Sequence, residues 1–134
     1  MTITNQANYA LRAMTFLAKT NDNKWISSDI IAKEMSIPRM FLSRINMLLV
    51  KAGLIDSRRG AGGGVKLAKE PDQISVYDVI SAIDGPILID KSLSNSENHD
   101  FPMADQFKSF FQSAQDLVED KFTQTSLEEL IEEL

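Results

Sequence analysis

The stretch from Gly53 to Ala68 constrains the fold more than any other part of the sequence. Two short runs typical of β-strands flank a tip in which four of five positions are glycine, namely Gly60, Gly62, Gly63 and Gly64. Glycine adopts positive φ without a Cβ clash, so this tip permits a tight hairpin whose backbone can approach another surface closely. Arg58 and Arg59 stand where the tip begins, which favours insertion along a polyanion.

Other glycine-rich motifs fit this stretch less well. A phosphate-binding loop needs serine or threonine after its lysine, but Lys66 is followed by Leu67. A dinucleotide-binding fingerprint needs a third glycine where Val65 stands and a helix after it, whereas a strand-like run follows here. A flexible hairpin with solvated arginines is the alternative that this stretch alone leaves open. The neighbouring segments favour a DNA-binding hairpin over it.

A helix-turn-helix pattern directly precedes the hairpin. Trp25-Ile26 is compatible with a short strand, and Ser27 or Ser28 can cap a helix that follows. The inward residues expected for this helix are Ile30, Ile31 and Met35. Pro38 fits the first position of a second helix, where a missing N–H costs nothing, and Gly53 is placed to end it after Ala52.

This second helix has two different faces. Its inward period comprises Leu42, Ile45, Leu48 and Leu49. Its opposite face carries Arg39, Met40, Ser43, Arg44, Met47 and Lys51. A helix in a DNA major groove needs donors near its N-terminal end and phosphate-binding cations farther along. An ordinary solvated face would look similar, but the adjacent hairpin favours groove insertion, so we predict a winged helix-turn-helix.

The distribution of charge supports a nucleic-acid partner, although the net charge of the chain is −5. Residues 36–69 hold seven Lys and Arg against one Asp, a net charge of +6. Residues 70–134 hold three Lys against fifteen acids, a net charge of −12. Because DNA affinity depends on local neutralisation of phosphates, a chain with this basic segment can bind DNA even though the rest of it is acidic.

Residue types needed for catalysis or metal binding are scarce. The chain has no cysteine, which excludes disulfides, thiolate nucleophiles, zinc–thiolate sites and cysteine-ligated iron–sulphur clusters. His99 is the single histidine, and among the neighbouring carboxylates a solvated loop residue is a simpler interpretation than a metal ligand. With no convergent acid–base cluster, we expect neither an enzyme nor a cofactor.

Nothing in the sequence indicates a membrane protein. No run approaches the roughly 18 apolar residues of a membrane helix, and the N-terminus lacks the charged-then-apolar pattern of a secretion signal. We therefore expect a cytoplasmic protein with no membrane partner.

The remaining elements are expected to be helices, which makes the fold mainly α with a small β-hairpin. A helix from after Thr4 to about Lys19 has apolar residues on two sides, as expected for one wedged between the head and a dimer element. Ser75 and Asp78 form a capping box, and Gly85-Pro86 ends the helix that it opens. Residues 92–100 are small and polar, and we expect a mobile loop there.

From Pro102 a long amphipathic helix is predicted to about Phe122. Its apolar seam, expected to pack against the first helix and a second subunit, contains Met103, Phe107, Phe110, Phe111, Ala114, Leu117 and Val118. Thr125 and Glu128 match a capping box that would open a last helix. We expect residues 1–85 to form the DNA-binding domain and residues 86–134 to form a loop and dimerisation helices.

Motifs along essentially the whole chain resemble the Rrf2 (Rrf-two) family of bacterial winged-helix transcription regulators. That family includes the iron–sulphur cluster regulator, the nitric-oxide-sensing repressor and the cysteine-metabolism repressor. The wing motif Ser57-x-Arg59-Gly60-x-Gly62-Gly63-Gly64 is the most specific part of the likeness. The other matching segments are Asn8-Tyr9-Ala10-Leu11-Arg12, Ser36-Ile37, Phe41-Leu42, Lys51-Ala52-Gly53-Leu54-Ile55, Leu67-Ala68, Ile74-Ser75-x-x-Asp78-Val79-Ile80 and Thr125-Ser126-Leu127-x-x-Leu130.

The resemblance implies a homodimer on a pseudo-palindromic operator, with the helix after Pro38 in the major groove and the wing along the minor groove. Arg59 is then the expected minor-groove or phosphate contact, and Phe41, Ser43 and Arg44 occupy the recognition stretch. Ser43 stands where relatives can carry glutamate, and Phe41 where tyrosine is common, so the operator sequence should differ. The full expected DNA-binding set is Arg39, Met40, Phe41, Ser43, Arg44, Lys51, Arg58, Arg59, Gly60, Gly62 and Gly63.

The largest departure from the family concerns sensing. Cluster-binding members place three cysteines in the loop that corresponds to about residues 89–104, and this chain has none. Asn8 and Arg12 stand where some relatives supply a ligand from the partner subunit, and neither side chain is a plausible replacement. We expect a repressor without an iron–sulphur cluster that responds to a protein or a small-molecule effector. The alternative is a regulator that acts through its aromatic seam by protein interaction, without DNA binding.

Overall fold

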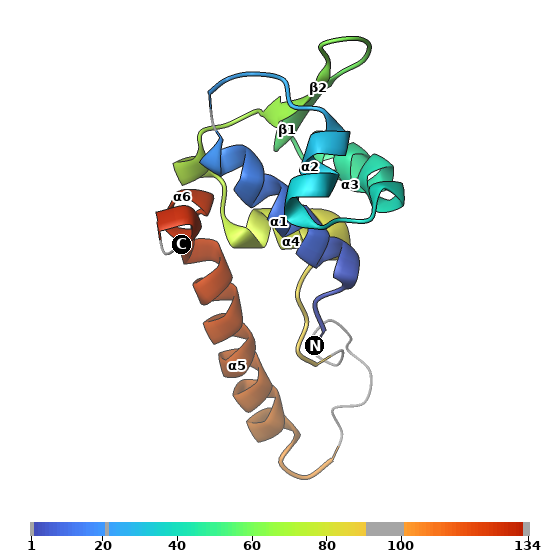
Figure 1. Ribbon diagram of the computed structural model, residues 1–134. Coiled ribbons are helices and arrows are strands. Elements are labelled where there is room, and N and C mark those ends of the chain that lie inside the picture. Colours follow the sequence, from blue (N-terminus) through green and yellow to red (C-terminus); the bar gives the residue numbers. More distant parts are fainter. Residues whose placement is uncertain (1, 21, 91–100, 133–134) are drawn as a thin grey trace.

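Helices dominate the computed structural model, which describes residues 2–20, 22–90 and 101–132. The elements run in the order α1 (Asn5–Lys19), α2 (Ser28–Met35), α3 (Arg39–Lys51), β1 (Ile55–Arg58), β2 (Gly64–Leu67), η1 (Pro71–Gln73), α4 (Val76–Asp84), α5 (Ala104–Gln124) and α6 (Leu127–Glu132). The expected mainly α fold with one small hairpin is confirmed. In Figure 1 the hairpin projects at one end of the molecule and α5 extends away from the other elements toward the opposite end. His99 and residues 92–100 lie outside the described residues.

Helix α1 begins where the sequence predicts and is fixed at its start to a distant part of the chain. The Thr4 hydroxyl oxygen accepts from the backbone N–H of Ala7 at 3.1 Å, as an N-cap does. The same hydroxyl donates to Asp84 Oδ1 at 2.5 Å, and the Thr4 backbone N–H donates to Asp84 Oδ2 at 3.2 Å. The first turn of α1 is therefore joined to the end of α4.

Helices α2 and α3 form the predicted helix-turn-helix, with Ser27 as the N-cap of α2 and Ser36 in the left-handed region at φ 54° between them. Asn46 Nδ2 donates to Ser28 Oγ at 2.9 Å and braces the two helices. The expectation for Ile30 was wrong, because its side chain is 51% exposed while Ile31 is fully buried. One residue turns about 100° on a helix, so a two-turn helix covers only one of two adjacent apolar positions.

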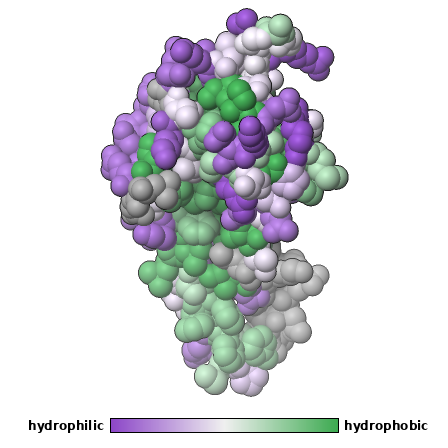
Figure 2. All heavy atoms as spheres, viewed as in Figure 1, coloured by the Kyte–Doolittle hydropathy of each residue, from purple (hydrophilic) through white to green (hydrophobic). Residues whose placement is uncertain are grey.

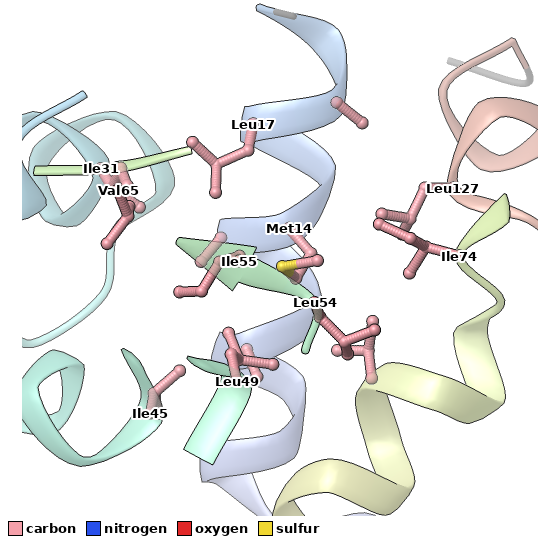
Figure 3. Packing of buried hydrophobic residues seen from close by; sticks show 14 of the residues in the cluster. Met14, Leu17, Ile31, Ile45, Leu49, Leu54, Ile55, Val65, Ile74 and Leu127 are labelled. Carbon is pink, nitrogen blue, oxygen red and sulfur yellow. The ribbon is translucent and has the colours of Figure 1, made fainter. Parts of the chain in front are cut away.

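One core joins the head of the molecule, which we define as every described element except α5. Figure 3 shows side chains from α1, α3, the hairpin and the segment before α4 meeting in this core. Met14, Leu49 and Ile55 are at most 1% exposed. Burying such side chains supplies the main stabilisation of the fold, on the order of 1.5–3 kcal/mol for each large one.

The last helix belongs to this head, although the sequence grouped it with residues 86–134. Leu127 is fully buried, and its N–H donates to the Ile74 carbonyl oxygen at 2.9 Å. The predicted capping box at Thr125 was wrong. Ser126 caps α6 by accepting from the Glu129 N–H at 3.1 Å, because the Thr125 hydroxyl donates to the carbonyl of Lys121 at 2.7 Å instead.

Helix α5 packs on the head mainly through α4. Val118 and Phe122 contact a small apolar cluster whose buried members are Ala7, Val76, Ile80 and Ile87. The expected neighbour, α1, contributes Ala7 to this cluster, while α4 forms its centre. Across the described ranges, no helix combines the length and apolar character needed to span a membrane.

Gln115 is a polar residue buried within α5, with 3% of its surface exposed. Its Oε1 accepts from the Ile89 backbone N–H at 2.7 Å, and its Nε2 donates to the Ile87 carbonyl oxygen and to Glu119 Oε1. A buried amide is stable only when its donors and acceptor are satisfied, and here they hold the segment after α4 against α5.

Candidate nucleic-acid interface

Helix α3 presents a continuous exposed face of the kind predicted from its sequence. Leu42, Ile45 and Leu49 are fully buried and fix the helix in the core. The opposite side is exposed and carries Arg39, Met40, Ser43, Arg44, Met47 and Lys51. Met40 and Met47 are 80% and 62% exposed, unusually far for large apolar side chains. Such a face offers donors, cations and apolar contacts to a flat or grooved polar surface.

Two residues in the first turn of α3, Arg39 and Phe41, contact other helices of the chain. Arg39 Nε donates to Asp29 Oδ1 at 2.6 Å, so this cation is paired with a carboxylate of α2. Phe41 is half-buried, and its ring lies 5.6 Å from the ring of Tyr9 on α1. Phe41 thus orients the start of the helix from within, while Arg44 and Ser43 remain on the outside.

The wing, residues 55–67, is an antiparallel hairpin in the register Ile55↔Leu67, Asp56↔Lys66, Ser57↔Val65 and Arg58↔Gly64. Its tip is a turn in which the Gly63 N–H donates to the Gly60 carbonyl oxygen at 3.0 Å. Gly62 has φ 76°, the positive value that the third position of a type II turn requires. Gly63 has no positive φ, but the tip needs glycine there because a Cβ would overlap the Arg58 carbonyl oxygen.

A short extended segment before α2 pairs with β2 and joins the wing to the helix-turn-helix. Ile26 and Val65 exchange both backbone hydrogen bonds at 2.9 Å. Gly64 has φ 144°, and a Cβ there would overlap the Ile26 carbonyl oxygen, so only glycine permits this close approach. The bridge holds the wing beside α2 and therefore sets its position relative to α3.

Sequence reasoning missed two residues of this region, Trp25 and Lys66. The Lys66 Nζ lies 4.6 Å from the centroid of the Trp25 ring, and the Arg58 Cζ lies 5.7 Å from it. The short strand expected at Trp25-Ile26 was the available signal, but it gave no indication of what the indole would contact.

Most positive charge on this face is free of carboxylates. Of the seven cations within residues 36–69, Arg39 is the one that forms an ion pair with a described residue. The six others are Arg44, Lys51, Arg58, Arg59, Lys66 and Lys69. Cations without carboxylate partners are available to neutralise a phosphate backbone.

The residues expected for dimerisation divide into two groups. Met103, Phe107, Phe110 and Leu117 are 62%, 49%, 65% and 74% exposed. Phe111, Ala114 and Val118 are half-buried, and Val118 packs within its own chain. Figure 2 shows apolar residues gathered over the lower part of this face of the molecule, where α5 lies, and many polar residues over the head.

Three comparisons relate this geometry to known proteins. A sequence model of the Rrf2 family, described as "Iron-dependent Transcriptional regulator", matches residues 3–133. The HTH-type transcriptional regulator NsrR of Bacillus licheniformis is 31% identical over 74% of this chain and 69% of its own length. A putative HTH-type transcriptional regulator of Aquifex aeolicus is 40% identical over 60% of the chain and 55% of its own. The solved structure of CymR (YrzC), the global cysteine regulator of Bacillus subtilis, superposes with a TM-score of 0.84 at 29% identity, covering 100% of this chain and 98% of that one.

The family description mentions iron, but this sequence has no cysteine to ligate an iron–sulphur cluster. Iron–sulphur clusters are held chiefly by cysteine thiolates, and the sequence contains none. Within residues 2–20, 22–90 and 101–132, no three His, Cys, Asp or Glu side chains are grouped so as to hold a metal ion. Arg12 donates from Nε to Asn8 Oδ1 at 2.9 Å and from an Nη to the Ser36 carbonyl oxygen at 3.2 Å, so both side chains serve structural contacts. The residues present do not fit an iron–sulphur cluster.

Proposed function

The chain belongs to the Rrf2 family of helix-turn-helix transcriptional regulators, and from this premise we propose that it acts as a homodimeric repressor on a pseudo-palindromic DNA operator. Each α3 would enter a major groove, and each wing would follow the adjacent minor groove. The single observation that carries the proposal is the rigid connection of two exposed basic elements. The Ile26–Val65 bridge holds the wing beside the helix-turn-helix, and six cations between residues 36 and 69 have no carboxylate partner among the described residues.

The exposed side chains divide by chemistry into two roles. Ser43, Arg44 and Met40 are placed to contact base edges, because they lie on the outer face of α3 near its start. Cations bind phosphates and fix the register, a role that we assign to Lys51, Arg58 and Arg59. Arg39 would take the same role once its ion pair with Asp29 opens. Gly60, Gly62 and Gly63 let the backbone of the tip approach the duplex. Phe41 supports this face by packing on Tyr9.

The second subunit would cover the seam of α5. Its apolar residues at 103, 107, 110, 114 and 117 follow alternating steps of four and three, the spacing by which two helices pack along one side. We propose residues 1–85 as the DNA-binding domain, whose core α6 completes, and the rest of residues 86–134 as the dimerisation region. The pairing of two heads would match the two halves of a palindrome.

Regulation would proceed without an iron–sulphur cluster, because the chain lacks thiolates. A protein or a small molecule that binds near the dimer helices is the effector that we propose, and the cytoplasm is the compartment where operator DNA is available. The second candidate function is protein interaction through the exposed aromatic seam of α5 without DNA binding. The exposed Phe107 and Phe110 favour it, while the unpaired wing cations argue against it.

Selection of genomic DNA fragments by the full-length protein tests the proposal. We expect enrichment of one symmetric motif, bound with a steep dependence on salt concentration. Arg59→Ala should weaken binding to all sequences and reduce the salt slope by about one. Arg44→Ala should instead relax sequence preference, by about 1–3 kcal/mol for a lost base contact. Lys108→Ala, an exposed cation on α5, is the matched control and should change neither property. Failure to enrich any sequence would overturn the proposal in favour of the second candidate.

A further inference from the structure

An aromatic residue from outside the wing, Trp25, lies against one face of the hairpin. Ile26 pairs with Val65, so the next residues, Trp25 and Lys66, lie across from each other on the opposite face of this small sheet. The hairpin register places Asp56 across from Lys66, and Arg58 two positions farther on β1 shares the same face. One indole, two cations and one carboxylate therefore meet on this face.

Both cations lie against the indole. The Lys66 Nζ is 4.6 Å and the Arg58 Cζ is 5.7 Å from the ring centroid, within the roughly 6 Å at which a cation is attracted to an aromatic face. Tryptophan is the strongest aromatic partner for such contacts. Trp25 is half-buried, and the backbone beside it is fixed by the Ile26–Val65 bridge, so the ring is attached to the rigid part of the head.

The group that holds Lys66 determines whether the positive charge of its side chain stays available to DNA. Asp56 stands directly across from Lys66, yet within the described chain no ion pair joins them. A carboxylate would fix the lysine in place and cancel its charge, whereas an aromatic ring fixes it and leaves the charge intact. Arg39 shows the other arrangement, because its guanidinium is paired with Asp29.

From this geometry we infer that Trp25 is a positioning residue for DNA binding. Its ring holds Lys66 and Arg58 in an extended arrangement on the wing, ready for two phosphates, at a lower entropic cost than two free side chains would incur. The inference rests on the proposed DNA-binding function and adds to it the residue that prepares the wing. A purely structural role for Trp25 would instead affect the stability of the hairpin and leave the charge-dependent part of binding unchanged.

A double-mutant cycle on the selected operator distinguishes these roles. We expect Trp25→Leu to weaken binding about two- to fivefold, the range of an exposed cation–π contact, and to lower the salt slope. Trp25→Phe keeps a ring and should recover part of both losses. In a chain that already carries Arg58→Gln and Lys66→Gln, Trp25→Leu should have no further effect on affinity. Thermal unfolding of each variant is measured alongside, so that a loss of fold is recognised.

The outcomes separate this inference from the function on which it rests. Wild-type protein that binds no duplex overturns both. Wild-type protein that binds, with Trp25→Leu equal to it in affinity and salt slope, overturns the role of Trp25 alone. That role is also overturned if Trp25→Leu weakens binding equally with and without the two cations. Because Trp25 is the one tryptophan of the chain, its fluorescence should also change when operator saturates the protein, and constant emission would contradict the placement of the ring at the contact.

Discussion

The head and α5 bury their apolar residues to very different extents. In the head, Met14, Ile45 and Leu49 are fully buried, each in contact with other elements of the same chain (Figure 3). On α5, Phe110 and Leu117 are 65% and 74% exposed. The head is thus stabilised by contacts that one chain completes alone. Helix α5 carries apolar side chains that the described residues leave exposed, and this is the surface that we propose a second copy covers.

Helix α5 itself contains both kinds of apolar residue, those that pack on the head and those that stay exposed. Val118, Phe122 and the hydrogen bonds of Gln115 tie one side of the helix to the head, while the exposed seam, which reaches Leu117, lies on another side. We therefore expect folding and the proposed assembly to depend on different residues of this helix, so that substitutions separate them.

The largest effect is expected for Leu49→Ala in the core of the head. The substitution removes fully buried methyl groups and should lower the free energy of unfolding by about 2–5 kcal/mol. Urea denaturation at two protein concentrations measures it, and the loss should be the same at both. Leu117→Ala removes the same atoms from an exposed site and is the matched control. Equal losses for the two variants would contradict the division into a self-sufficient head and a dependent helix.

Phe110→Glu should produce the next largest effect, on assembly rather than on folding. A charge in the centre of the seam should weaken dimerisation by about 2 kcal/mol or more, roughly thirtyfold. Sedimentation equilibrium measures the change, and the stability of the monomeric head should stay the same. Gln112→Glu adds the same charge on the opposite face of α5 and should leave the dimer intact. A dimer that survives Phe110→Glu would show that the seam is not the subunit contact.

Gly64→Ala should disturb the wing within an otherwise intact head. The new methyl group would overlap the Ile26 carbonyl oxygen, in addition to the cost of about 1–3 kcal/mol for a side chain at positive φ. Gly60→Ala is the control, because Gly60 has φ 94° but open space around it. We expect a greater loss of stability and of operator affinity for Gly64→Ala than for Gly60→Ala. Similar losses would mean that the bridge to Ile26 does not position the wing.

The smallest effect is expected for Asp29→Asn on the surface of the head. The side chains of Arg39 and Asp29 are 53% and 83% exposed, and such pairs contribute at most about 1 kcal/mol to stability. Released from its carboxylate, Arg39 gains freedom to contact phosphate, so the salt slope of DNA binding should rise slightly. Unfolding and binding titrations give the two quantities. A large loss of stability would show that the head depends on this surface pair as well as on its core.

Local patterns of the sequence predicted the elements well where the signal was itself local. Thr4, Ser27 and Ser75 cap the helices that follow them, and the Ser75–Asp78 capping box is present in full. Gly53 follows the end of α3 as predicted, and the glycine tip turns the hairpin. Pro38 was expected as the first residue of this helix but is its N-cap, one residue before Arg39. Each of these features depends on residues within a few positions of one another.

Features that depend on distant segments were not accessible from the pattern. The neighbour of α5 is mainly α4 because the chain places Val76 and Ile80 against Val118, which periodicity alone does not specify. Thr125 and Ser126 offer equivalent caps in sequence, but the Thr125 hydroxyl bonds to Lys121 and Ser126, which pairs with the distant Ser75, is the cap. For the interface, the exposed face of α3 was predictable from its helical period. The pairing of Arg39 with Asp29 and the contacts of Trp25 depended on where three elements meet.

Gln115 gives the chain a mechanical linkage between its two regions. Its side-chain amide forms hydrogen bonds with the backbone of Ile87 and Ile89, just beyond α4. Asp84, the last residue of α4, accepts a hydrogen bond from Thr4 at the start of α1. We expect a tilt of α5 to reach α1 through these hydrogen bonds and the backbone between Asp84 and Ile87 that connects them. In the homodimer that we propose, the angle between the two α5 helices would then set the distance between the two DNA-binding units.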